Sequence, residues 1–208
     1  MKNIEFKQKL KTLGSVTRKS IQMSQDELIK TSYLQSDDSL PLVVQPNVGN
    51  LNLAVWSQHN IAWIEHKLLK HGGILFRGFQ LKKVTEFQKF MQEISNNLLD
   101  YSYGSTPRSY VEEKIYTSTE YPADYHIILH NEMSYSRYWP MKIAFFCIKK
   151  ALKGGETPIA DSRKVLARID TKIKEKFLQK KVMYVRNYGL GLDLTWQQAF
   201  NTNDKSEV

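Results

Sequence analysis

The sequence predicts an α+β protein with a mainly-β core, and three observations lead to this fold class. Apolar residues recur at helical spacing over 53–70 and over 85–99. The compact apolar run ILFRGF at 74–79, between these helices, is typical of a buried strand. After Asp100 the chain changes to alternating segments rich in Tyr and Thr, as strands are. The 208 residues, 41% of them hydrophobic and 25% charged, suffice for one ordinary domain or two small ones.

The part of the chain before Asp100 divides into a lead-in and the start of a domain. Residues 1–39 are polar and mixed, so we expect a loosely attached lead-in to a domain that spans 40–208. LPLVVQP at 40–46 is β-branched and ends at a proline, which indicates a strand or an extended arm. The helix over 53–70 should stop at the following Gly-Gly pair, because glycine often caps helix ends.

Four further strands and a basic helix are expected after Asp100. The strands are predicted for KIYTSTEYP (114–122), DYHIILHNEMSYS (124–136), MKIAFFCIKK (141–150) and KVMYVRNYG (181–189). LKGGETPIAD at 152–161 indicates a glycine turn followed by an extended piece. RKVLARIDTKIKEKFLQKK has apolar residues at helical spacing, which predicts an amphipathic helix with Lys and Arg on its outer face. LTWQQAF predicts a short helix near the end.

The net charge and the cysteine content limit which binding partners and which cellular compartment we expect. A net charge of +9 invites nucleic-acid binding, but Lys149 to Arg186 carries twelve basic and four acidic residues, mostly on the predicted helix. Without zinc-finger spacing, a phosphate-cradling loop or a long apolar run, we expect neither a nucleic-acid nor a membrane partner. The single cysteine, Cys147, lies in the run IAFFCI, and the start is unlike a secretory signal. We therefore expect a buried thiol and a cytoplasmic protein.

The pattern with the most chemical content is His130-Asn131-Glu132. In a strand, positions i and i+2 face the same side, about 6.6 Å apart. An imidazole and a carboxylate so placed can meet on one ion, as in the facial triad of two histidines and one carboxylate that holds Fe(II). The spacing also arises by chance, so a histidine beside an unrelated acid is the alternative. His126 faces the same side but lies about 13 Å away, too far for the same metal.

The surrounding sequence resembles the TauD/TfdA family of Fe(II)- and 2-oxoglutarate-dependent dioxygenases. The resemblance is carried by KIYTSTEYPADYHIILHNEMSYSRYWP, by KIAFFCIKKALKGGETPIADSRKV and by the earlier HGGILFRGF, and it extends over about residues 40–200. It is strongest to the branch near SyrP-type hydroxylases and clavaminate synthase, which use Glu in the metal motif. The resemblance implies a double-stranded β-helix, or jelly roll, of the clavaminate synthase-like type, with Fe(II) and the co-substrate 2-oxoglutarate.

The resemblance also implies roles for single residues. His130 and Glu132 would be two iron ligands, and Thr157 would contact the 2-oxoglutarate carboxylate from the turn at Gly154-Gly155, which by itself is also a plain hairpin turn. A carboxylate at position 132 favours hydroxylation or desaturation over halogenation. Three further residues are candidates for lining the substrate pocket, with a packing role as the alternative: His126, Tyr116 and Arg108.

Two residues that the family needs are missing from this chain. The family has a second histidine on a late strand and an arginine about ten residues further, which pairs with 2-oxoglutarate. No histidine follows His130, and Arg163 and Arg168 come too soon after the glycine turn. The histidines at 59, 66 and 71 are expected on the surface or at helix ends. The chain thus resembles the N-terminal portion of such an enzyme, with an incomplete jelly roll.

The function expected from the sequence is hydroxylation of an unactivated C–H bond in a small or carrier-bound substrate. Without the late histidine and arginine this activity is expected to be impaired, and a completing C-terminal chain is a possible partner. The first alternative is a non-catalytic fragment or binding module that retains part of the fold. The second is a nucleic-acid binder that uses the basic helix, whose affinity would fall steeply with salt.

Overall fold

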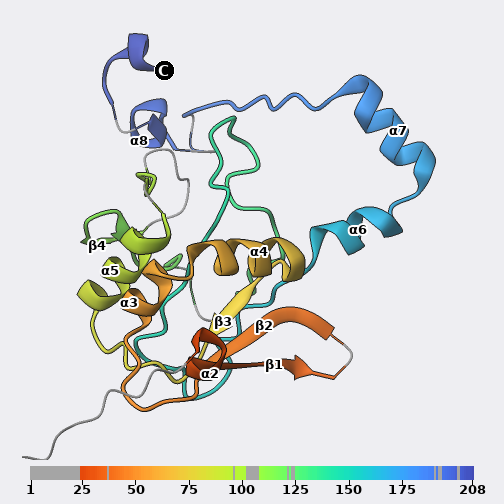
Figure 1. Cartoon of the computed structure of the whole chain (residues 1–208). Helices are drawn as coiled ribbons and strands as arrows, with labels where there is room; N and C mark the ends of the chain where they lie inside the picture. Colours follow the sequence, from red (N-terminus) through yellow and green to blue (C-terminus); the bar gives the residue numbers. More distant parts are fainter. Residues whose placement is uncertain are drawn as a thin grey trace, which may run out of the picture.

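The computed structural model describes residues 24–36, 38–95, 97–101, 108–120, 122, 125–189, 191, 194–200 and 202–208. Residues 1–23, most of the predicted lead-in, lie outside this part, as do positions 121 and 124 of two predicted strands. Figure 1 shows a body of sheet and helices, with long extended segments and a helical arm leading away from it. The arm consists of α6 (Ser162–Arg168) and α7 (Thr171–Lys180).

Strand β2 (Asp38–Pro46) is the centre of the three-stranded sheet in the body. It pairs antiparallel with β1 (Ile29–Gln35) on one side and parallel with β3 (Ile74–Phe76) on the other. Its Leu-Val-Val run is buried, and Val44 is 0% exposed, as β-branched residues on a covered strand often are. The two strands predicted before Asp100 are therefore confirmed.

Strand β1 shows that the expected lead-in is partly built into the sheet. The description of residues 1–39 as loosely attached does not hold for Ile29–Gln35, which pair with β2 along most of their length. β1 is an edge strand with only Ile29 buried, so its polar composition concealed it. The short helix α2 (Gln25–Leu28) precedes it. The domain boundary at residue 40 stays a prediction.

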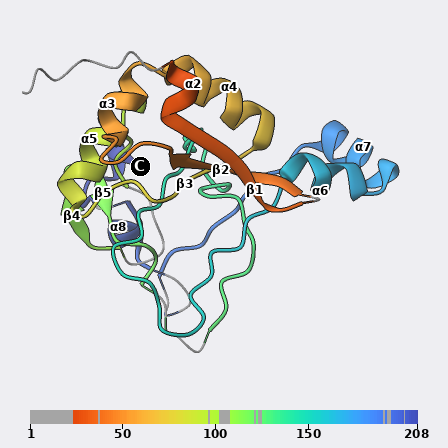
Figure 2. The same cartoon turned by 60° about the horizontal axis from the view of Figure 1, so that its bottom comes forward.

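Helices α3 (Leu53–Gln58), α4 (Ile61–His71) and α5 (Val84–Ile94) pack beside the sheet, with α3 next to α5 (Figures 1 and 2). The helix predicted over 53–70 is present but broken into α3 and α4. It ends as expected, because Gly72 is left-handed at φ 79° and its N–H donates to Leu68 O at 2.7 Å. The buried core is formed by Ile29, Leu42, Val44, Leu53, Trp56, Ile64, Phe87 and Phe90.

The second half of the described chain has fewer strands than the sequence predicts. Strands β4 (Tyr110–Glu112) and β5 (Ile115–Tyr116) form a short antiparallel hairpin. Of the strand predicted over 114–122, only β5 forms among the described residues, and β4 was not predicted. Strands stabilise one another through hydrogen bonds to a neighbour. No strand forms among the described residues of three other segments, so these predictions are wrong there: 124–136, 141–150 and 181–189.

The fold class is thus confirmed in part. Helices and strands coexist, as an α+β fold requires, but the core lies between helices and a three-stranded sheet and is not mainly β. A complete double-stranded β-helix is not seen among the described residues, which hold one three-stranded and one two-stranded sheet.

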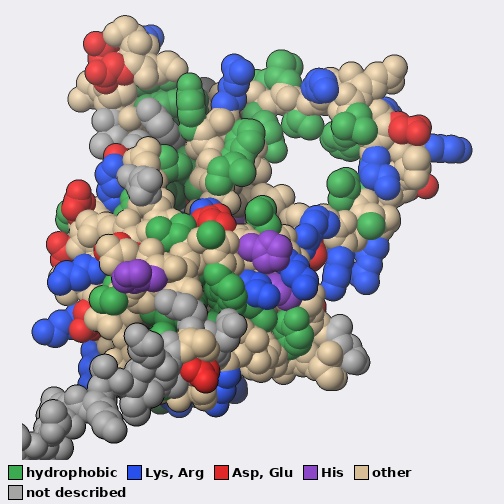
Figure 3. Space-filling model, in the orientation of Figure 1, with side chains coloured by type: hydrophobic (Ala, Val, Ile, Leu, Met, Phe, Trp, Pro, Cys, Tyr) green, Lys and Arg blue, Asp and Glu red, His purple; other side chains and the backbone are tan. Residues whose placement is uncertain are grey.

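The arm replaces the single basic helix that the sequence predicts. Its two helices begin at side-chain caps, since Asp161 accepts from Arg163 N at 2.9 Å and Asp170 accepts from Lys172 N at 2.8 Å. The second cap breaks the helix in two. The apolar side of the arm is uncovered as well as its basic side, with Phe177 58% exposed (Figure 3). After the arm, an extended segment leads to α8 (Trp196–Phe200), the predicted short helix, and to the 3-10 turn η2 (Lys205–Glu207).

Cys147 lies on an exposed segment, so the expected buried thiol is wrong. The segment contacts the body through Lys142, which forms an ion pair with Glu65, and through Phe146, whose ring stacks on that of Phe87 at 5.1 Å. The other large apolar side chains of this segment are exposed, and no described part of the chain covers them: Met141, Ile143, Phe145 and Ile148. None of the helices in the described part of the chain is long and apolar enough to cross a membrane.

The aromatic cluster in the body gives a direct test of the core. The ring of Phe90 is 6% exposed and packs edge-on against Phe76 at 5.3 Å. We predict that Phe90→Ala lowers the free energy of unfolding by about 3–5 kcal/mol, because it leaves a cavity. The matched control is Phe177→Ala on the arm, where the loss should be small. Urea denaturation measures both, and equal losses would contradict this core.

His71 makes the stability of the body depend on pH. It is 3% exposed, and its Nδ1 lies 3.2 Å from Ser39 O. Burial lowers its pKa below the ordinary 6.5, with a smaller contribution from Lys70. The unfolded chain therefore binds this proton more readily, and stability should fall as the pH drops below about 6.5 towards the lower folded pKa.

We predict that the unfolding midpoint in urea falls when the pH is lowered from about 7.5 to about 5.5. In His71→Gln this part of the pH dependence should disappear, whereas His66→Gln, at an exposed position of the same helix, should retain it. An unchanged pH dependence in His71→Gln would show that other groups cause it.

Candidate functional site

His130 and Glu132 lie close together in the extended segment after β5, although this segment is not a strand. The His130 Nε2 and Glu132 Oε2 atoms are 3.7 Å apart, beyond a normal hydrogen bond. The two side chains therefore lie on the same side of the backbone, as their spacing indicates. At this distance His130 Nε2 and Glu132 Oε2 are neighbours that do not form a direct hydrogen bond.

A local hydrogen bond determines which ring nitrogen of His130 carries the hydrogen. His130 Nδ1 lies 2.8 Å from the carbonyl oxygen of Ile128. Because a carbonyl can only accept, Nδ1 carries the hydrogen, and in the neutral ring Nε2 then holds a free lone pair. The same arrangement orients metal-binding histidines in proteins, where the other ring nitrogen donates to a carbonyl or carboxylate. The ring nitrogen that faces Glu132 is thus the one able to bind a metal.

Glu132 is also held by Arg108, which comes just before β4. Arg108 Nη2 lies 3.2 Å from Glu132 Oε1, and the two side chains are only 15% and 22% exposed. The guanidinium stacks over the Tyr101 ring, with Cζ at 4.5 Å from the ring centre, and Nη2 is also 3.4 Å from Thr119 Oγ1. Arg108 and Glu132 belong to different segments of the chain, so their ion pair is a tertiary contact.

The backbone next to Glu132 has an unusual conformation. Met133 is left-handed at φ 51°, and its side chain is 9% exposed. For a residue other than glycine this costs on the order of 1 kcal/mol. Burial of the Met133 side chain, together with the hydrogen bond from Ser136 N to Met133 O at 2.9 Å, offsets that cost. The turn at Met133 ends the extended segment and places Glu132 beside Arg108.

A tyrosine lies close enough to this group to be affected by its charges. Tyr135 is 44% exposed, and its partial burial raises the pKa of the phenol. Tyr101 and Glu132 raise this pKa further, while Arg186 and Arg108 act in the opposite direction. The phenol of Tyr135 therefore stays neutral over the physiological range. Sequence patterns gave no indication of Tyr135.

Thr157 is not joined to the pair. It is exposed, and no hydrogen bond links it to His130 or Glu132 in the described part of the chain. The expected glycine turn is present, with Gly154 at φ 66° and Gly155 at φ 77°, where an added Cβ would lie 2.7 Å from that of Ala151. Five residues after Thr157, Ser162 Oγ comes within 3.5 Å of Asn131 Oδ1. The chain after the turn therefore returns to the His130 segment.

The three pocket candidates differ in their positions. Arg108 contacts Glu132 directly. Tyr116 packs against Tyr101 and Tyr110, and its hydroxyl accepts from Tyr101 N at 3.3 Å, so it has the packing role that was the alternative. His126 is exposed in the extended segment. His59 and His66 are exposed, as expected.

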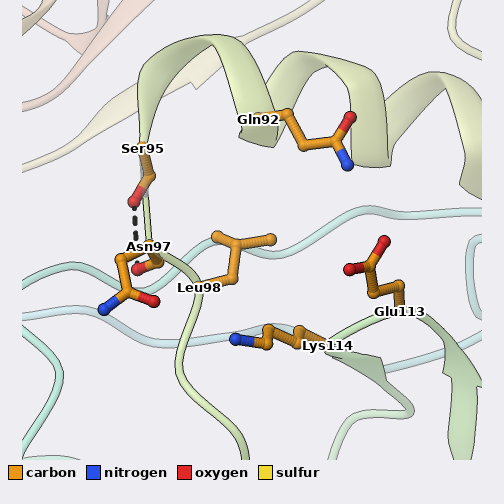
Figure 4. A pocket seen from close by; sticks show the side chains of 6 residues that line it. All are labelled: Gln92, Ser95, Asn97, Leu98, Glu113 and Lys114. Atoms are coloured by element: carbon orange, nitrogen blue, oxygen red, sulfur yellow. Dashed lines mark hydrogen bonds between the residues drawn. The ribbon is translucent and has the colours of Figure 1, made fainter.

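A cavity exists elsewhere on the surface but lacks comparable chemistry. It has a volume of about 340 Å³ and is bordered by Gln92, Ser95, Asn97, Leu98, Glu113 and Lys114 (Figure 4). Its two charged groups have local partners: Glu113 accepts from Gln88, and Lys114 pairs with Asp100. Nothing that borders it belongs to the His130–Glu132 pair. Among the described residues no cluster of three or more His, Cys, Asp or Glu could hold a metal.

Comparison with known proteins identifies the family. Residues 36–207 match the family model described as "Taurine catabolism dioxygenase TauD, TfdA family", and the chain belongs to this family. Its members generally use Fe(II) and 2-oxoglutarate, and membership implies a jelly-roll fold. The resemblance found in the sequence is confirmed.

Two curated proteins are similar to the chain. The dapdiamide synthesis protein DdaC of Enterobacter agglomerans is 43% identical over 145 residues, which are 70% of this chain and 44% of that protein. A clavaminate synthase-like protein of Arabidopsis thaliana is 32% identical over 154 residues, which are 69% of this chain and 46% of that protein. The chain thus spans less than half the length of each relative that it matches.

The residues present fit two positions of an iron site. A neutral imidazole nitrogen and a carboxylate oxygen are ligands that non-haem Fe(II) takes in the facial triad. The site needs a third protein ligand, and the described residues around the pair offer no further histidine or carboxylate for it.

Proposed function

We propose that this chain supplies two metal ligands of an Fe(II)- and 2-oxoglutarate-dependent oxygenase that hydroxylates an unactivated C–H bond of a small or carrier-bound substrate. The observation that carries the proposal is the His130 Nε2 lone pair facing Glu132 Oε2 across 3.7 Å. Family membership supports it, since the family as a whole is one of oxygenases. The same family supports a location in the cytoplasm.

In this proposal His130 and Glu132 hold the iron, which, when bound, supplies the oxidising chemistry with 2-oxoglutarate and oxygen. The Ile128 carbonyl keeps the proton of His130 on Nδ1, so that Nε2 stays available. Thr157 contacts the 2-oxoglutarate carboxylate, and His126 lines the substrate side. Thr157 is exposed, so its hydroxyl is accessible to a co-substrate. A carboxylate ligand at position 132 favours hydroxylation or desaturation over halogenation.

The remaining parts of the site would come from a completing C-terminal segment, in the same chain or in a partner. It would supply the third iron ligand and an arginine for 2-oxoglutarate. Two facts support this: the chain spans less than half of its relatives, and the extended segments around Cys147 and Val182–Val185 expose apolar side chains that a further β layer would cover.

We predict that the chain binds Co(II), used as an air-stable substitute for Fe(II), and that His130→Ala and Glu132→Ala each weaken binding by about tenfold or more. Isothermal titration calorimetry gives the affinities. His66→Ala is the matched control, because this imidazole is exposed on α4 and should leave the affinity unchanged. Equal binding in all four proteins would contradict the site.

We also predict that the chain alone turns over little 2-oxoglutarate, because it binds iron through two ligands. Adding a polypeptide that corresponds to the distal half of a relative should increase succinate release and reduce the fluorescence of a dye bound to exposed apolar surface. If the chain binds Co(II) but neither change occurs, the alternative of a non-catalytic binding module is favoured.

A further inference from the structure

The carboxylate of Glu132 uses its two oxygens for different neighbours. Oε1 accepts from Arg108 Nη2 at 3.2 Å, while Oε2 faces His130 Nε2 at 3.7 Å. In a bidentate ion pair, the guanidinium of an arginine donates a hydrogen bond to each of the two carboxylate oxygens. Here only Nη2 of Arg108 donates, and it donates to Oε1, which leaves Oε2 for another partner.

The guanidinium of Arg108 is itself fixed from several sides. It stacks on the Tyr101 ring, and Nη2 also contacts Thr119 Oγ1. Arg108 Nε is buried and has no hydrogen-bond partner in the described part of the chain, so stacking and the contacts of Nη2 determine its position. Rotation of the guanidinium into a bidentate arrangement with Glu132 would break the stacking on Tyr101 and the contact with Thr119.

The position of Arg108 is set by the core through the β4–β5 hairpin. Next to Arg108, Ser109 N donates to Thr117 Oγ1 at 2.8 Å, and Thr117 N donates to Ser109 O at 2.9 Å. The turn of this hairpin is joined to α5, where Gln88 Nε2 donates to Glu113 Oε2 at 3.3 Å. A continuous set of contacts therefore leads from the core helix to the Glu132 carboxylate.

We infer that Arg108 is a positioning residue that holds Glu132 by Oε1 so that Oε2 alone is presented to the metal beside His130. This inference rests on the proposed function. The guanidinium has two opposite effects on a bound dication, since it orients the ligand but also repels the ion. Orientation is proposed to be the larger effect, and the affinity of Arg108→Gln for Co(II) measures the balance between the two. Outer contacts that orient a metal ligand typically change affinity 10- to 100-fold.

The test compares three variants with the unaltered chain by calorimetric titration with Co(II) and by the visible absorption of the bound ion. Arg108→Gln should weaken Co(II) binding by about tenfold or more and change the absorption spectrum. Arg108→Lys should restore part of the affinity, because an ammonium can still donate to Oε1. Arg137→Gln, at an exposed arginine five residues after Glu132, should bind like the unaltered chain.

The outcomes distinguish a failure of this inference from a failure of the proposed function. If the unaltered chain does not bind Co(II), both fail. If it binds, and His130→Ala abolishes binding while Arg108→Gln binds equally or more tightly with the same spectrum, the inference alone is overturned. Urea denaturation without metal checks that the variants fold. Should Arg108→Gln be unfolded, Arg108→Lys decides. An ammonium lacks the planar stacking of the guanidinium on Tyr101 and fixes Glu132 less firmly, so the affinity should lie below that of the unaltered chain, and unchanged affinity and spectrum would overturn the inference.

Discussion

The ion pair between Arg108 and Glu132 is the contact on which the candidate site depends. It joins the well-packed body, through the β4–β5 hairpin, to an extended segment that has no strand partner among the described residues. Without it, Glu132 would be placed only by the turn at Met133. The site is therefore positioned by a charge contact with the body, and the regular alternation of a strand is not needed to bring the carboxylate to the imidazole.

The elements of the body could be predicted from the sequence because their signals are local. Apolar spacing indicated α4 and α5, and the Gly-Gly pair indicated the helix end at Gly72. A β-branched run indicated β2, and a compact apolar run indicated β3. The exceptions have physical reasons. β1 is a polar edge strand whose pairing with β2 is not visible in its own composition, and Asp170 caps a new helix within the predicted basic one.

The strands predicted after Asp100 needed neighbours that the described chain does not provide. Alternation shows only that a segment can pair, and pairing is a property of two segments. The site could be predicted in the same partial way. The spacing of His130 and Glu132 indicated that their side chains lie on the same side, and His130 Nε2 and Glu132 Oε2 lie 3.7 Å apart although the segment is not a strand. That they share a metal ion stays a prediction. Arg108 is 24 residues from Glu132, so nothing local could identify their contact. The role of Thr157 stays a prediction.

The central claim is that the Nε2 atom of His130 and the Oε2 atom of Glu132 share one metal ion. The most direct measurement is nuclear magnetic resonance of the chain with isotope-labelled histidine, titrated with substoichiometric Mn(II), whose unpaired electrons broaden nearby signals. The imidazole signals of His130 should broaden first and those of His59 and His66 last, and Glu132→Ala should abolish this order. Equal broadening of all the histidines, or a sharp His130 signal, would contradict the claim.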